Sequence, residues 1–139
     1  MNNETPTPPP SDGEPFENVI FSYTRKQALA DGVQVDVSAT AKEAGFRIPV
    51  FITDTVYNEY VKVPADAEAQ DEAGRLWDIL MMLRHAIKKA DAQASRLPFC
   101  LYVRNDNRSP KLVTLHSVCG ALDIDDPAPS ITIMLPTED

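Results

Sequence analysis

The N-terminal part of the hydrophobic pattern predicts two short helices on either side of a strand. Thr24 and Ser38 are suited to cap the helices, and Gly32 and Gly45 can end them in the left-handed conformation. Between the helices, apolar and polar residues alternate over residues 33–37, which is the period of a strand. These short elements therefore form a helix, a strand and a helix in succession.

A buried strand and a further helix are predicted next. Residues 47–53 (RIPVFIT) are apolar and partly β-branched, which is typical of a strand buried on both faces. Thr53 or Asp54 can cap a helix that ends near Val61, before Pro64.

The longest amphipathic segment runs from about Ala67 or Asp71 to about Ala92. Its apolar residues recur at helical spacing: Leu76, Ile79, Leu80, Leu83 and Ile87. Trp77, Met81 and Met82 widen the apolar face beyond an ordinary stripe. We therefore expect a central helix that is covered on more than one side, with Trp77 as a core anchor.

Three strand patterns follow the long helix. Residues 97–103 and 112–119 flank a turn-rich segment and predict a hairpin, in which symmetric pairing would place Cys100 opposite Leu115. Residues 131–135 alternate and predict a final strand. The order of elements predicts an α+β fold, with a mainly antiparallel sheet of four to five strands packed on one long helix plus short helices.

Composition adds a domain boundary to this picture. The chain has 139 residues, of which 43% are hydrophobic and 24% charged, as is usual for one globular domain. Residues 1–15 hold five prolines but no aromatic or branched aliphatic residue, so we expect a disordered proline-rich tail. The predicted globular domain is residues 16–139.

The negative charge is concentrated at the two ends of the sequence. The formal net charge is −8; residues 1–15 carry −3, residues 112–139 carry −5, and the segment between them is neutral. If acidic residues before the long helix met those of the C-terminal segment, they would form a continuous negative face. The candidate acidic interaction face comprises Asp66, Glu68, Asp71, Glu72, Asp123, Asp125 and Asp126.

Positive charge is concentrated in one block. Residues 84–111 hold seven bases and two acids, with Tyr102 among them as an aromatic side chain able to stack on a base. The candidate basic interaction face comprises Arg84, Lys88, Lys89, Arg104, Arg108 and Lys111. The block would suit nucleic acid, or it is a solvated face that pairs with the acidic C-terminal segment.

Residue types that carry chemistry are few and scattered. The sequence has two cysteines (Cys100 and Cys119) and two histidines (His85 and His116), without the close spacing that a zinc site requires. His116 could approach either cysteine across the sheet, although an exposed strand histidine and two partly buried thiols are the simpler interpretation. We predict no catalytic residue, no metal ligand and no cofactor.

The chain also lacks the patterns of a membrane or secreted protein. Its longest apolar run is far shorter than the ~20 residues that span a bilayer, and its first residues do not form a signal peptide. With two cysteines there is no disulfide framework. We therefore expect a cytoplasmic protein without membrane contact.

Several long stretches resemble a known family. They are YTRKQALADGVQVDVSATAKEAGFRIPVFIT at 23–53, QDEAGRLWDIL at 70–80, LPFCLYV and KLVTLHSV in the hairpin, and SITIMLPTED at 130–139. Residues 16–139 resemble a family of short acidic bacterial proteins of unknown function carried on plasmids, integrative elements and prophages. The resemblance implies an accessory gene of mobile DNA and supplies no catalytic residues.

Three functions remain as expectations. The first is a non-enzymatic accessory protein that binds a host protein, with anti-defence activity of the anti-restriction or anti-CRISPR type as one form. The second is a small nucleic-acid-binding regulator that uses the basic block. The third and least favoured is an enzyme, because no nucleophile is paired with a base. The partner's identity and the oligomeric state stay open.

Overall fold

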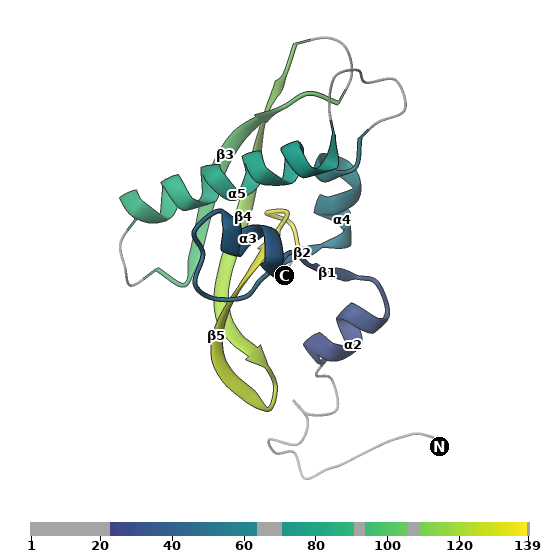
Figure 1. Ribbon diagram of the computed structural model, residues 1–139, viewed down its shortest axis with the longest axis vertical. Helices are drawn as coiled ribbons and strands as arrows, with labels where there is room; N and C mark the ends of the chain where they lie inside the picture. Colours follow the sequence, from purple (N-terminus) through teal and green to yellow (C-terminus); the bar gives the residue numbers. More distant parts are fainter. Residues whose placement is uncertain (1–22, 64–70, 91–93, 106–108, 139) are drawn as a thin grey trace.

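The computed structural model describes residues 23–63, 71–90, 94–105 and 109–138, so the predicted proline-rich tail lies outside the described residues. These residues form one five-stranded sheet in the order β1-β2-β5-β4-β3 (Figure 1). The strands are β1 (Gln34–Asp36), β2 (Val50–Thr53), β3 (Arg96–Val103), β4 (Lys111–Asp123) and β5 (Asp126–Met134). The predicted α+β fold is confirmed. All neighbouring pairs are antiparallel except β2 and β5, which are parallel.

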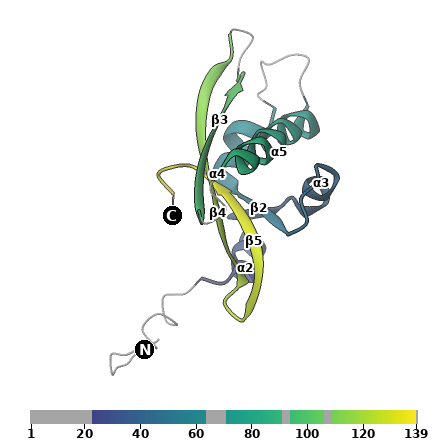
Figure 2. The same ribbon diagram turned by 90° about the vertical axis from the view of Figure 1, so that its left-hand side faces the viewer.

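The helices lie on both sides of the sheet. They are α2 (Arg25–Ala30), α3 (Ser38–Glu43), α4 (Asp54–Val56), the π-helix η1 (Tyr57–Val61) and the long α5 (Glu72–Lys89). Figure 2 shows α5 and α3 on the same side of the sheet. On the opposite face, α2 is held by Arg25, whose guanidinium lies 4.0 Å from the ring centre of Phe51. None of the described helices is long and apolar enough to cross a membrane.

Three of the predicted caps are confirmed, whereas Ser38 is the first residue of α3 and not its cap, because Val37 takes the capping position without a side-chain hydrogen bond. Thr24 forms a capping box with Gln27, and Thr53 accepts a hydrogen bond from the Val56 amide. Asp71 caps α5 by accepting a 2.5 Å hydrogen bond from the Gly74 amide. Each bond satisfies a backbone donor at a helix start that has no partner within the helix.

The core lies between α5 and one face of the sheet. Alternate residues of the four longer strands point toward α5, which presents its own apolar stripe to them. The buried core side chains include Val50, Ile52, Leu76, Ile79, Leu80, Leu83, Phe99, Leu101, Leu115, Ile131 and Ile133.

The expectation for the outer side of α5 is wrong. Trp77 is 37% exposed, and Met82 and Ile87 are also exposed, so α5 is not covered on more than one side. Successive residues of an α-helix are rotated by about 100°, which carries Trp77 away from the stripe that begins at Leu76. Trp77 is therefore a surface residue of α5, not a core anchor.

The hairpin register differs from the symmetric pairing by one residue. Cys100 lies opposite Thr114, and Phe99 takes the place opposite Leu115. Cys119 lies beyond the end of the β3 pairing and next to Ser95, so the two cysteines do not oppose each other. Both thiols are exposed, contrary to the expectation of partial burial. His116 is half-buried, contrary to the expectation of an exposed strand histidine.

Candidate functional site

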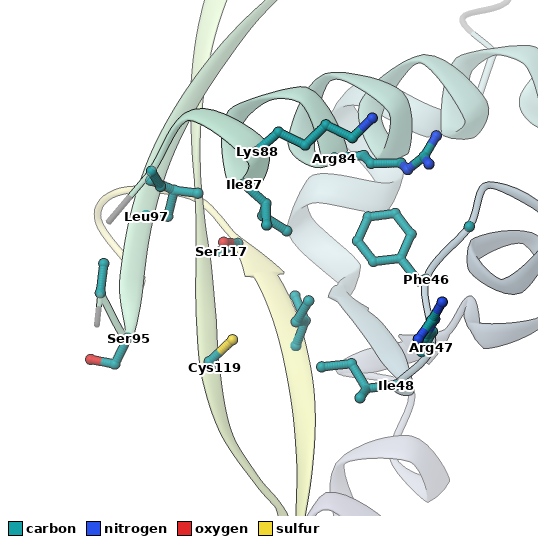
Figure 3. Close-up of a pocket in the computed structure, with 14 residues that line it drawn as sticks. Phe46, Arg47, Ile48, Arg84, Ile87, Lys88, Ser95, Leu97, Ser117 and Cys119 are labelled. Carbon is teal, nitrogen blue, oxygen red and sulfur yellow. The ribbon is translucent and has the colours of Figure 1, made fainter. Parts of the chain in front are cut away.

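A groove opens along the side of α5 that faces the loop after α3. Its inner part, the deep pocket, has a volume of about 460 Å³ and lies between the C-terminal half of α5, the 45–48 loop and strands β3 to β5 (Figure 3). An outer hollow of about 790 Å³ shares the loop and Arg84 with the pocket and extends to Ser38, Lys42 and Pro49. We call the two together the groove.

The deep pocket has mainly apolar walls. They come from elements far apart in the sequence: Phe46, Ile48, Ile87, Ala90, Ala94, Leu97 and Ile131. Pockets of this size and composition are usual for ligands with a large apolar surface. The polar side chains of the deep pocket lie among these apolar residues.

Four cationic side chains line the groove. Lys42 and Arg47 come from α3 and the loop after it, and Arg84 and Lys88 come from α5. No acidic side chain lines either part of the groove among the described residues. Within the same residues, the four side chains form no ion pair or hydrogen bond with one another or with other groups. In a chain of net charge −8 the groove is thus a local concentration of unpaired positive charge.

The loop that carries Arg47 is shaped by Gly45. Gly45 has a φ of +103°, a conformation that residues with a side chain rarely adopt, and it lets the chain leave α3 toward α5. A Cβ atom at Gly45 would lie 3.1 Å from both Cζ and Nε of Arg84. The guanidinium group of Arg84 is therefore packed directly against the backbone at this glycine.

Strand β4 supplies the inner polar groups of the deep pocket. Ser117 and Cys119 project from β4 into it (Figure 3). Ser117 is only 4% exposed, and its hydroxyl forms no hydrogen bond to any described residue. Among the described residues, the buried side-chain polar atom without a hydrogen bond is Nδ1 of His116, whereas the Ser117 hydroxyl belongs to a residue that lines the pocket.

The structure separates the candidate acidic interaction face into two groups. Asp71 and Glu72 begin α5, whereas Asp123, Asp125 and Asp126 lie at the turn between β4 and β5. That turn is at the lower end of the molecule in Figure 1, while α5 crosses the upper half. Asp66 and Glu68 lie outside the described residues. The described acids therefore do not form one continuous face.

Asp123 has a structural role at its end of the molecule. Its carboxylate accepts hydrogen bonds from the backbone amides of Arg25 (2.9 Å), Lys26 (3.0 Å) and Ile124 (2.7 Å). These bonds, that from Ile124 foremost, lower the pKa of Asp123 below its ordinary value. Asp123 thus fastens the start of α2 to the β4–β5 turn.

Two further acids contribute to local structure. Glu72 accepts a 2.7 Å hydrogen bond from the Tyr57 hydroxyl, which raises the pKa of that tyrosine. Asp126 accepts one from the Ala128 amide in the turn.

The candidate basic interaction face is divided as well. Arg84 and Lys88 line the groove, whereas Lys89 does not. Arg104 lies near the start of α5, because its carbonyl accepts a hydrogen bond from Arg75. Arg75 and Lys88 are thirteen residues apart on α5, which corresponds to about 20 Å along the helix axis.

Two further members of the basic block follow β3 in the sequence. Lys111 begins β4, opposite Val103 at the end of β3. Arg108 lies outside the described residues. Among the members of the block that the structure describes, only those on α5 belong to the groove.

Lys42, Arg47 and Ser117 are site residues that the sequence analysis missed. A signal for Arg47 was present, because a glycine suited to end a helix is followed at once by Phe46 and Arg47. The proximity of Lys42 and Arg47 to α5 could not be derived from a sum of charge along the chain. Arg75 was missed as well; it is buried and donates to the carbonyls of Tyr60 and Arg104.

The residue types for catalysis are not assembled at one place. His116 lies opposite Pro98 and Met134, on the face of the sheet away from the groove, whereas Cys119 lines the groove. Cys100 lies opposite Thr114, with its sulfur 3.4 Å from the Thr114 hydroxyl. In the part of the chain that the structure describes, no three His, Cys, Asp or Glu side chains are grouped so that they could hold a metal ion.

Fold and groove together define a small α+β protein with an apolar groove, whose rim carries cations that pair with none of the described residues. The chain belongs to a family of unknown function (DUF6573), whose profile matches residues 15–139. No curated protein and no solved structure gives a significant match to the chain.

Proposed function

We propose that this protein is a non-enzymatic binding protein that holds an acidic segment of another protein in its groove. The observation that carries the proposal is the grouping of Lys42, Arg47, Arg84 and Lys88 around an apolar pocket, without acidic or hydrogen-bonding partners among the described residues. An anionic chain with apolar side chains would supply the missing charge and cover the walls.

The two parts of the groove make different contributions. Apolar burial contributes roughly 25 cal/mol for each Å² removed from water, so the deep pocket supplies affinity. The cations raise the rate of encounter with an anion and disfavour a basic segment. Because the remainder of the chain is acidic, positive partners are drawn elsewhere on the surface and negative ones to this groove.

A protein partner is favoured over nucleic acid. Affinity for nucleic acid comes largely from phosphate contacts along the strand, and a chain of net charge −8 repels a long polyanion outside the groove. Arg104 lies beside Arg75, which is separated along α5 by about 14 Å from Arg84 and about 20 Å from Lys88, so the full basic block does not act together in the groove. A small nucleic-acid-binding regulator that uses the basic block is the alternative, and an enzyme is the least favoured function.

The family resemblance supplies the biological side of the proposal. We expect the gene to be carried on plasmids, integrative elements or prophages, and the protein to act in the bacterial cytoplasm. The partner is then a host protein, and a component of a host defence system is the class we would test first, with anti-restriction or anti-CRISPR activity.

The experiment compares two adjacent lysines. Lys88 lines the groove and Lys89 does not, yet both lie in the last turn of α5. Replacement by glutamate at either position has a similar effect on the helix dipole, so Lys89→Glu is a matched control for Lys88→Glu. Wild type and both variants would be tested on arrays of acidic, neutral and basic peptides and against a labelled oligo(dT) strand.

We expect acidic peptides with apolar side chains to be retained by wild type and Lys89→Glu. Lys88→Glu should weaken that binding at least about tenfold, because a like charge then faces the peptide. A nuclease-treated host extract should yield a protein that shows the same dependence. Preference for oligo(dT), or equal binding by the two variants, would refute the proposal.

A further inference from the structure

The deep pocket has a polar floor beneath apolar walls. Phe46, Ile87 and Leu97 form part of the walls, whereas the Ser117 hydroxyl lies at the β4 side with no hydrogen bond among the described residues. Only 4% of the surface of Ser117 is exposed. A wholly apolar occupant would cover this hydroxyl without giving it a partner.

An occupant that covers the Ser117 hydroxyl without offering it a partner incurs a cost, and this cost selects the occupant. A buried donor or acceptor without a partner loses its bonds to water and receives nothing in exchange. An occupant with an apolar body and a polar tip therefore fits better than one that is apolar throughout. Tyrosine has this form, and its phenol can both donate to and accept from a serine hydroxyl.

The volume of the deep pocket and the positive charge at its rim restrict the occupant further. A pocket of about 460 Å³ has room for an aromatic ring and part of the backbone that carries it. The cations above the pocket, Arg84 and Lys88 among them, favour carboxylates on the residues that flank the ring. Tryptophan offers only a donor, and phenylalanine offers neither group.

We infer that the partner segment carries a tyrosine flanked by acidic residues, and that this tyrosine enters the deep pocket and bonds to Ser117. The inference rests on the proposed function, since it assumes an acidic segment in the groove. It specifies which residue of that segment enters the deep pocket. It also makes Ser117 the residue that distinguishes tyrosine from phenylalanine.

The test uses three fluorescein-labelled peptides, EDYDE, EDFDE and EDADE, titrated with the full chain. We expect EDYDE to bind about 3- to 10-fold more tightly than EDFDE, the ratio that one neutral hydrogen bond supplies. EDADE should be weaker than EDYDE by at least about tenfold, because it leaves the apolar walls uncovered. Anisotropy gives the dissociation constants.

Variants of the chain test whether Ser117 is the origin of the preference for EDYDE over EDFDE. Ser117→Ala should remove the difference between EDYDE and EDFDE, and Ser117→Cys, which keeps the volume close to that of serine, should reduce it. Thr114→Ala is the control, because Thr114 lies on the same strand and faces the other side of the sheet. Thermal unfolding of each variant checks that the fold is retained.

The outcomes separate the two proposals. If acidic peptides bind through Lys88 but EDFDE equals EDYDE, the tyrosine inference is wrong and the proposed function stands. If the tyrosine preference survives Ser117→Ala in a folded variant, Ser117 is not its origin and the inference is wrong. If no acidic peptide binds and none of the four cations matters, both proposals fail.

Discussion

Replacing Gly45 by alanine is expected to weaken both the fold and binding in the groove, whereas the same change at Gly32 weakens the fold alone. Both glycines have a positive φ, +103° at Gly45 and +77° at Gly32. An alanine in such a left-handed conformation costs about 1–2 kcal/mol. Gly45 lies further from the left-handed minimum near +57° than Gly32 does, so its backbone penalty is at least as large.

The surroundings of the two glycines differ. A Cβ at Gly32 would meet nothing within 4 Å, whereas one at Gly45 would lie 3.1 Å from the Arg84 guanidinium. The guanidinium is the end of a flexible side chain, so it can shift by a few tenths of an ångström at little cost to folding. Its position over the groove changes, and with it the contact that Arg84 offers to an anion.

Thermal unfolding by circular dichroism and titration with EDYDE measure the two effects. Gly32→Ala should unfold about 3–8 °C below wild type, the shift that corresponds to 1–2 kcal/mol in a domain of this size, and Gly45→Ala at least as far below it. Binding should fall about 3- to 10-fold for Gly45→Ala, which is part of the contribution of one charge-assisted hydrogen bond. Gly32→Ala should bind as wild type does. Equal binding by the two variants would show that the contact between Gly45 and Arg84 does not shape the site.

Three further changes test the account of the fold. Trp77→Ala should cost about 1–3 kcal/mol by denaturant unfolding, less than the 3–5 kcal/mol of a fully buried tryptophan, because the side chain is 37% exposed; a larger loss would contradict its surface position. Arg75→Met should cost about 2–4 kcal/mol, since the carbonyls of Tyr60 and Arg104 lose a charged donor; an unchanged melting temperature would refute this. Asp123 has a folded-state pKa below its ordinary 3.8, so its contribution is complete above that pH and is lost as the pH falls through the folded-state value. The fall in stability of Asp123→Asn between pH 5 and strongly acidic conditions should therefore be smaller than that of wild type; parallel curves would exclude the role of Asp123 as an anchor for α2.

Local features of the fold could be predicted from the sequence because they depend on neighbouring residues. Thr24 and Asp71 satisfy amide groups three residues ahead, and Gly45 supplies a conformation that its own lack of a side chain permits. The parallel pairing of β2 with β5 could not be predicted in this way. It joins residues that are remote in the sequence, and no local period specifies which strand will be the neighbour.

The groove was only partly predictable for the same reason. Arg84 and Lys88 belong to a basic block that is visible in the sequence, but Lys42 and Arg47 precede it by about forty positions. A charge sum over a window cannot show that two such segments meet, nor that the block itself is divided by the length of α5. Ser117 gave no signal, because a serine that follows a period of two on a strand is ordinary until its neighbours in space are known.

The parallel pair also has a consequence for synthesis of the chain on the ribosome. Val50 of β2 pairs with Ile131 of β5, and β5 then bridges β2 to β4. Until β5 has emerged, β1 and β2 have an open edge of unpaired backbone groups, which is a site for wrong association between nascent chains. The sheet can close only after β5 has been synthesised, and a slow, concentration-sensitive folding step is the expected result.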